Sequence, residues 1–121
     1  MAQEYIFHIC RRDEWTQARA QGVYGGSSQD REDGFIHFST ASQVQQSAAK
    51  HRAGQRGLVL LTVDPGALGD ALRWELSRDN RLFPHLYGAL APSAVMRTDD
   101  LPLDENSGQH VFPTSFSAPH V

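Results

Sequence analysis

The stretch Leu58-Val59-Leu60-Leu61-Thr62-Val63 is an apolar run of strand length, and the turn residues Asp64-Pro65-Gly66 follow it. A strand without polar alternation is typical of a position in a sheet that is covered on both faces. We therefore predict that residues 58–63 form the central strand of a sheet, with further elements packed on each side.

Further strands are expected around this run, because short segments rich in aromatic and β-branched residues alternate between apolar and polar positions. They are Tyr5–Cys10, Phe35–Ser39, Leu72–Ser77 and Ala94–Thr98. In the first of them, His8 shares a face with Ile6 and Cys10. The segment Phe83–Gly88 contains Pro84, which predicts an edge strand or an ordered loop.

Two helices are predicted from their end signals. Asp13 is the expected N-cap of the first, which Gly22 stops. Thr40 and Gln43 form a capping-box pattern, so the second helix is expected to begin directly after a strand. Residues 22–34 carry four glycines and two serines and are expected to form a loop.

The chain has 121 residues, of which 40% are hydrophobic and 21% are charged. This length and composition are typical of one folded domain. Five or six short strands with two main helices predict an α+β fold with a small mixed or antiparallel split sheet. We expect a single domain over residues 1–106 and a partly disordered tail over residues 107–121.

Charge and cysteine content narrow the classes of partner and compartment. The net charge is −3 and the 11 Lys and Arg residues are scattered, so no basic groove for a nucleic acid is indicated, although an RNA end needs only a local pocket. The single cysteine, Cys10, excludes an intramolecular disulfide. We find no secretory signal at the first residues and no apolar run that could span a bilayer, so we expect a cytoplasmic protein without membrane contact.

Three of the six histidines, His8, His37 and His85, fall within apolar strand-like segments. Buried ring nitrogens need hydrogen-bond partners, so each residue taken alone is most simply a structural histidine. Three in separate segments of a small domain favour a shared pocket in which they are candidate catalytic residues, together with Glu75. For Glu75, which lies in a strand beside Arg73, the alternative is an ordinary charged surface.

Ser39, Thr40 and Tyr87 are candidate ligand-binding residues. Ser39 has the strand parity of His37, and Thr40 begins a helix, where hydroxyl and backbone N–H groups bind anions. For Thr40 the alternative is simple capping. Tyr87 shares a face with His85 and offers a ring for stacking or a hydroxyl for hydrogen bonding.

Several reaction classes lack their sequence motifs. The chain contains no His-Glu-x-x-His, no Cys-x-x-Cys, no glycine-rich phosphate loop and no Gly-x-Ser-x-Gly turn. Three histidines match the ligand count of a catalytic zinc, but their wide spacing does not specify one. We therefore predict a site without a metal.

Five segments, taken in order, resemble a bacterial family, the domain-of-unknown-function family 952. They are Tyr5-Ile6-Phe7-His8-Ile9 with Trp15, Asp33-Gly34-Phe35-Ile36-His37-Phe38-Ser39-Thr40, Leu58 to Asp64, Trp74-Glu75, and Phe83-Pro84-His85-Leu86-Tyr87-Gly88. The resemblance covers roughly residues 4–98. Ala89 stands where the family pattern has proline.

The resemblance implies an ADP-ribosyltransferase-like fold, which holds NAD in a cleft between two small sheets. A first-strand histidine of that superfamily binds the nicotinamide ribose, which assigns this role to His8. A second-strand tyrosine or histidine followed by serine or threonine assigns the second role to His37 with Ser39. The third role, that of a late acidic or polar residue, is open between Glu75 and His85. NAD is the implied cofactor, and the RNA 2′-phosphotransferases of the superfamily make an RNA end a second substrate class.

Three functions follow as hypotheses. The first is an NAD-linked ADP-ribosyltransferase-like or phosphotransferase-like enzyme, and the second is a non-catalytic module that binds a nucleotide, a sugar phosphate or another anion. The third is an interaction domain with structural histidines. A cleft that contains His8, His37 and His85 together favours the first two.

Overall fold

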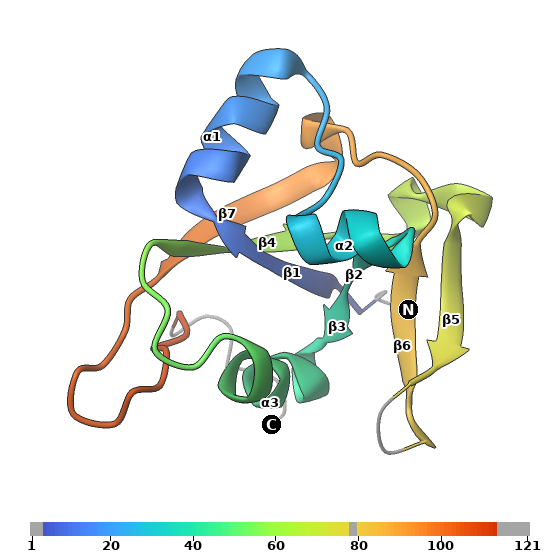
Figure 1. The fold of residues 1–121 in the computed structure, drawn as a ribbon. Coiled ribbons are helices and arrows are strands. Elements are labelled where there is room, and N and C mark those ends of the chain that lie inside the picture. Colours follow the sequence, from blue (N-terminus) through green and yellow to red (C-terminus); the bar gives the residue numbers. More distant parts are fainter. Residues whose placement is uncertain (1–3, 78–79, 114–121) are drawn as a thin grey trace.

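The computed structural model describes residues 4–77 and 80–113 and contains two sheets (Figure 1). The larger sheet has the strand order β3-β1-β4-β7 and the smaller one the order β2-β6-β5. Every pairing between neighbouring strands of these two sheets is antiparallel. The α+β class and the antiparallel sheets agree with the sequence prediction.

The larger sheet is built around its most apolar strand. Its members are β1 (Ile6–Arg11), β3 (Ser39–Thr40), β4 (Leu58–Val63) and β7 (Val95–Leu101). Strand β4 lies between β1 and β7, and all six of its residues are buried. The prediction of a central strand at residues 58–63 is confirmed.

Two hydrophobic clusters cover the two faces of the larger sheet. Alternate residues of β1 belong to different clusters, Ile6 and Cys10 to one and Phe7 and Ile9 to the other. The first cluster also contains residues of α1 (Arg12–Gln21) and of the smaller sheet, and the second contains residues of α3 (Ala41–His51). His8 has the parity of Ile6 and Cys10 and so points toward the smaller sheet.

Helix α1 begins earlier than the sequence indicates. Its N-cap is Arg11, the last residue of β1, whose extended backbone leads directly into the helix. The prediction that Asp13 is the N-cap is therefore wrong. Asp13 lies in the first turn, where its charge interacts favourably with the helix dipole. At the other end Gly22 has the left-handed conformation (φ 84°) that stops helices, as predicted.

The segment 22–34 contains a third helix where a loop was predicted. This helix, α2, covers Ser28–Asp33. Ser27 is its N-cap and forms a reciprocal capping box with Asp30, and Gly34 ends it in the left-handed conformation (φ 89°). A helix of six residues is unstable alone, so these end contacts and its packing hold it in place.

The predicted strand Phe35–Ser39 is divided between the two sheets. Its first part, β2 (Ile36–His37), pairs with β6 in the smaller sheet, and Ser39 and Thr40 pair with β1 in the larger one. Phe38 lies between them and is buried. The crossing brings His37 and Ser39 to the junction of the two sheets.

The smaller sheet consists of β2, β5 (Leu72–Leu76) and β6 (Leu82–Leu86). The prediction of an edge strand or loop at residues 83–88 is wrong, because β6 is the central strand. Pro84 is tolerated because its carbonyl accepts from Phe38 N at 3.0 Å, just beyond the two-residue β2. The N and C=O of a strand residue point to the same side of the strand. The N–H that Pro84 lacks would therefore face the chain just after β2 has ended, where the ladder between β2 and β6 has no further hydrogen bond to lose.

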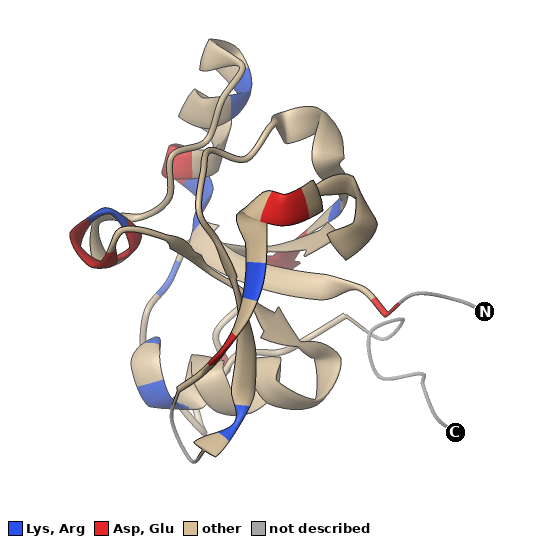
Figure 2. Cartoon of the chain, turned by 90° about the vertical axis from the view of Figure 1, so that its right-hand side faces the viewer, with Lys and Arg blue, Asp and Glu red and all other residues tan. Residues whose placement is uncertain are grey.

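The remaining described residues form short connections. The 3-10 turns Pro65–Ala67 and Gly69–Ala71 join β4 to β5, and Pro92–Ala94 precedes β7. None of the helices in the described part of the chain is long and apolar enough to cross a membrane. Figure 2 shows acidic and basic segments interspersed on the side of the molecule that it presents.

Residues 107–113 belong to the range for which the sequence predicts partial disorder. They are hydrogen-bonded, since Val111 N donates to Pro102 O at 2.8 Å and His110 pairs with Leu103. Phe112 packs against the cluster on α3. Residues 114–121 of the same range lie outside the described residues.

Candidate functional site

A cleft of about 740 Å³ opens at the junction of the two sheets. His8, His37 and His85 all line it, and so does Ser39. The lining therefore combines residues of β1 and β3 from the larger sheet with residues of β2 and β6 from the smaller one. The three histidines that the sequence singles out share one cavity.

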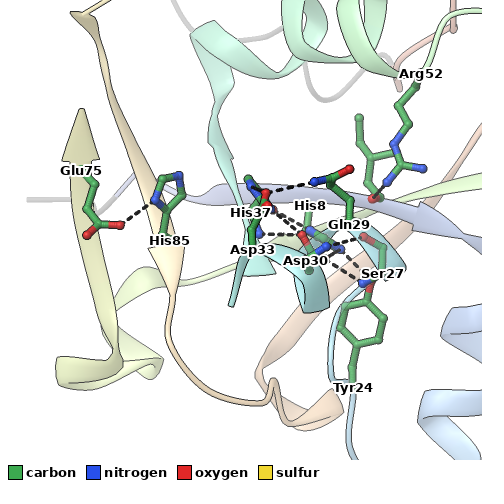
Figure 3. A network of polar contacts seen from close by, with 11 residues as sticks. His8, Tyr24, Ser27, Gln29, Asp30, Asp33, His37, Arg52, Glu75 and His85 are labelled. Carbon is green, nitrogen blue, oxygen red and sulfur yellow. Dashed lines mark hydrogen bonds and ion pairs between the residues drawn. The ribbon is translucent and has the colours of Figure 1, made fainter. Parts of the chain in front are cut away.

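Asp30 holds His37 in place (Figure 3). Its Oδ1 accepts from His37 Nδ1 at 2.6 Å and from the backbone N of His37 at 3.1 Å. Its Oδ2 accepts from Ser27 N at 2.7 Å. The side chain is only 3% exposed, so α2 buries one carboxylate to orient one imidazole.

The carboxyl of Asp30 is ionised over the physiological pH range. Burial acts to raise its pKa, but the hydrogen bond from the His37 ring and the two backbone N–H donors outweigh burial and lower the pKa to about 2. The site therefore contains a buried negative charge compensated by its own donors.

The second nitrogen of His37 faces the cleft. Nε2 lies 3.0 Å from Oδ2 of Asp33, and the ring is 39% exposed. Gln29 Nε2 donates to the same Asp33 oxygen at 3.2 Å. Asp33 is itself 38% exposed, so solvent reaches this contact.

Both nitrogens of His8 are occupied within the protein. Nδ1 lies 2.6 Å from the carbonyl oxygen of His37, which only accepts, so Nδ1 carries the proton. Burial lowers the pKa of His8 below its ordinary value and keeps the ring neutral, although the Asp30 charge acts in the opposite direction. Nε2 then accepts from the Tyr24 hydroxyl at 2.7 Å. His8 fixes the backbone that carries His37 and offers no free nitrogen to a ligand in this arrangement.

Two buried groups beside His8 remain protonated. Burial raises the pKa of Tyr24, so its hydroxyl acts as the donor to His8. Burial also raises the pKa of Cys10 to about 12. The Cys10 thiol is therefore a core group and not a nucleophile at neutral pH.

His85 is oriented by a second carboxylate. Its Nδ1 lies 2.8 Å from Glu75 Oε1, and the Tyr87 hydroxyl donates to the same oxygen at 2.7 Å. The hydrogen bonds from His85 and Tyr87 lower the pKa of Glu75, and the bond to Glu75 raises the pKa of Tyr87. The Phe35 ring stacks on His85 with centroids 4.1 Å apart. Glu75 and Tyr87 reach the cleft only through His85.

His37 and His85 lie directly opposite each other on β2 and β6. Their ring centroids are 5.5 Å apart and both rings line the cleft. In each ring a carboxylate binds Nδ1, so a proton exchange with a ligand would take place at Nε2, which in His37 is paired with Asp33. Such carboxylate-oriented imidazoles are typical of general acids and bases.

The two hydroxyl residues at the start of α3 differ in position. Ser39 lines the cleft and donates to Ser47 Oγ at 3.3 Å. Thr40 is the N-cap of α3, its backbone N donates to Gln43 Oε1 at 3.0 Å, and it does not line the cleft. The structure thus supports the capping alternative for Thr40. Over the described residues, no group of three or more His, Cys, Asp or Glu side chains could hold a metal ion.

The family model described as "Protein of unknown function (DUF952)" matches residues 9–98. The chain belongs to the DUF952 family. The resemblance that the sequence segments indicate is therefore confirmed at the level of the family.

Solved structures of protein CC0527 from Caulobacter crescentus share this fold. The crystal structure of protein CC0527 from Caulobacter crescentus is 45% identical over 93% of this chain and 98% of that chain, with a TM-score of 0.88. The solution NMR structure of CC0527 is 49% identical over 84% of this chain and 88% of that chain, with a TM-score of 0.76. No curated protein matches the chain.

Sequence reasoning missed Tyr24, Asp30, Asp33 and Arg52, which line or support the cleft of this DUF952 protein. One signal was present for two of them. Ser27-x-x-Asp30 has the spacing of a capping box and Gly34 is a suitable helix stop, which together predict α2 and place Asp30 and Asp33 on it. Nothing in the sequence indicates that Asp30 turns its carboxylate toward His37.

Proposed function

We propose that the cleft is the active site of an enzyme that acts on a nucleotide-type small molecule, with NAD as the first ligand to test. The main support for this proposal is the pair of imidazoles of His37 and His85. A carboxylate holds each ring at Nδ1, and both rings line one cleft. Oriented imidazoles at neutral pH accept and return protons. The cleft volume of about 740 Å³ is suitable for a ligand of this size.

NAD is favoured because of the resemblance to ADP-ribosyltransferases, which hold NAD between two small sheets. The arrangement of the cleft supports it, since residues of both sheets line the cavity. The resemblance implies a second-strand histidine followed by a serine. His37 and Ser39 match this pattern and lie on either side of the sheet junction.

In such a reaction the bond between C1′ of the ribose and the nicotinamide nitrogen breaks, and nicotinamide leaves with the bonding electron pair. An acceptor hydroxyl then attacks C1′ and releases its proton. His37 can accept that proton at Nε2 after Asp33 has moved from this nitrogen toward C1′, because Asp30 stabilises the ring when it becomes positively charged.

The cation that develops at C1′ needs a nearby negative charge. The resemblance leaves this role open between Glu75 and His85, but Glu75 does not line the cleft, whereas Asp33 does. We therefore assign the stabilising carboxylate to Asp33. His85, oriented by Glu75, is placed to bind a hydroxyl or phosphate oxygen of the ligand.

Titration with NAD, followed by NMR, tests the proposal. Signals of His37, His85 and Ser39 should shift at NAD concentrations up to the millimolar range, and free nicotinamide should accumulate. His37→Ala should abolish nicotinamide release, whereas the control His120→Ala, in a segment outside the described residues, should not.

The outcomes separate the three hypotheses. Shifts without nicotinamide release would support the non-catalytic binding module. The hydrogen bonds of both His8 nitrogens to groups of the protein also favour that module. No shift with NAD, ADP-ribose or AMP would contradict a nucleotide site altogether. If His37→Ala then changed only the melting temperature, the histidines would be structural.

A further inference from the structure

The cleft extends beyond the histidines to a region lined by Arg52 and Glu14. In Figure 3, Arg52 lies on the opposite side of the polar network from Glu75 and His85. Arg52 is the C-cap of α3, and Glu14 is in the first turn of α1. Neither residue takes part in the contacts of His37 or His85 described above.

Arg52 brings a positive charge into the cleft that no carboxylate among residues 4–77 and 80–113 approaches to ion-pair distance. Its guanidinium donates to the carbonyl of Ile9 at 3.0 Å and to Oε1 of Gln55 at 3.3 Å, and both acceptors are neutral. These bonds fix the side chain on the wall of the cleft. They use two of the five N–H groups of the guanidinium, so three N–H groups remain to donate to an anion.

Glu14 is the second lining residue with an unused hydrogen-bonding group. Its Oε1 is buried and finds no hydrogen-bond donor among the described residues. A buried carboxylate oxygen without a donor is rare in folded proteins. Glu14 also lines the cleft, so a rotation of its side chain when a ligand binds would let a ligand hydroxyl donate to this oxygen. The same end of the cleft thus presents a cation without a partner at ion-pair distance and a carboxylate oxygen without a donor among the residues that the structure describes.

From these two residues we infer that this end of the cleft binds the phosphorylated ribose of the ligand. Arg52 contacts a phosphate oxygen, and Glu14 accepts from a ribose hydroxyl. The inference rests on the proposed function and narrows its substrate class to nucleotides that carry at least one phosphate. A nucleoside or free nicotinamide lacks the group that Arg52 recognises.

Binding of AMP and adenosine to the full chain, measured by calorimetry, tests the phosphate contact. The wild-type protein should bind AMP at least about tenfold more tightly than adenosine, since a charge-assisted contact contributes at least this factor. Arg52→Gln should remove the preference and leave adenosine binding unchanged. Arg19→Gln, which removes the same charge from an exposed position of α1, should retain it.

Pyrophosphate distinguishes failure of this inference from failure of the proposed function. Its addition at constant ionic strength should shift the Nε–Hε signal of Arg52 in the wild-type protein and in His37→Ala. That result supports the phosphate contact even if no nucleoside binds. An unmoved Arg52 signal, or equal affinity for AMP and adenosine, overturns the inference while a nucleoside site at the histidines still stands.

Two further variants cover the remaining outcomes. If Arg52→Gln does not fold, because Arg52 also holds the carbonyl of Ile9, Arg52→Lys keeps the charge without the planar fork and should retain only part of the AMP preference. Glu14→Gln should weaken AMP binding more than binding of 2′,3′-dideoxy-AMP. Equal effects on the two nucleotides would remove Glu14 from the proposed site.

Discussion

The Nδ1 atom of His37 lies 2.6 Å from Oδ1 of Asp30, and the same carboxylate accepts from the backbone N of His37. One side chain of α2 therefore fixes both the ring and the main chain of a β2 residue. This double contact explains why a helix of only six residues is part of the site. It also predicts that the position of the His37 ring depends on Asp30.

Asp30→Asn should lower the free energy of unfolding by about 2 kcal/mol, the range for hydrogen bonds to charged groups. The amide nitrogen cannot accept, so either the His37 ring or a backbone N–H loses its partner. The ¹⁵N signals of the His37 ring should shift as its orientation loosens. Urea denaturation and NMR measure the two effects.

Asp33→Asn is the matched control, because Asp33 pairs with the other nitrogen of the same ring at a partly exposed position. Its loss of stability should stay below about 1 kcal/mol. Equal losses for the two variants would show that burial of Asp30 contributes nothing special.

The buried neutral His8 predicts a loss of stability toward acidic pH. The unfolded chain protonates His8 near the ordinary value of 6.5, whereas burial lowers the pKa of His8 in the folded protein. The unfolded state thus binds more protons below pH 6.5, so the contribution is present above that pH and is lost as pH falls toward the folded value. The slope amounts to at most about 1.4 kcal/mol per pH unit.

His8→Asn should reduce that slope between pH 6.5 and 5. The variant keeps a donor for the His37 carbonyl but loses the bond to Tyr24, so its stability at pH 7.5 should be lower by about 1–3 kcal/mol. Urea midpoints of the wild-type protein and of His8→Asn, measured across this pH range, give the two slopes. An unchanged slope would assign the acid sensitivity to other groups.

Tyr87→Phe should raise the pKa of Glu75 toward its ordinary value. Tyr87 and His85 donate to the same oxygen of Glu75, and each bond stabilises the ionised form. The carboxyl ¹³C signal of Glu75, followed through a pH titration, reports the change. Tyr5→Phe alters an exposed tyrosine elsewhere and should leave the titration as it is; a shift in this control as well would point to a general effect.

The sequence predicted the parts of the fold that depend on local patterns. Strand parity placed His8 on one face with Ile6 and Cys10, and the apolar run identified β4 as central. It placed Pro84 at an edge because proline removes a ladder bond, but the two-residue length of β2 removes that cost. Such a compensation depends on a neighbouring strand that no local pattern reveals.

In the candidate site, too, local patterns predicted some features, whereas others depend on tertiary contacts. His37 and His85 were identified because histidines are unusual in apolar strands, and the structure brings them opposite each other. Glu75 was also identified, but its contact with His85 arises only through the pairing of β5 with β6. Asp30 was not identified, because its contact with His37 depends on how α2 packs against β2. These contacts arise from tertiary packing, which spacing along the chain does not encode.

Gly26 is predicted to be required for the position of Asp30. It has φ +97°, and an added Cβ would lie 2.7 Å from Asp30 Cβ and 3.2 Å from Ile36 Cγ1. Gly26→Ala therefore combines an unfavourable left-handed conformation, about 1–2 kcal/mol, with a steric overlap that costs about 1–3 kcal/mol more. The overlap should also move the His37 ring signals, because Asp30 holds that ring.

Gly34→Ala separates the two contributions, since Gly34 has φ +89° and no atom within 4 Å of an added Cβ. It should lose only the conformational part, about 1–2 kcal/mol, and leave the His37 signals in place. Urea denaturation of both variants, with NMR of the histidine rings, gives the comparison. If the two substitutions cost the same and neither moves His37, close packing of Gly26 against Asp30 does not position the ring.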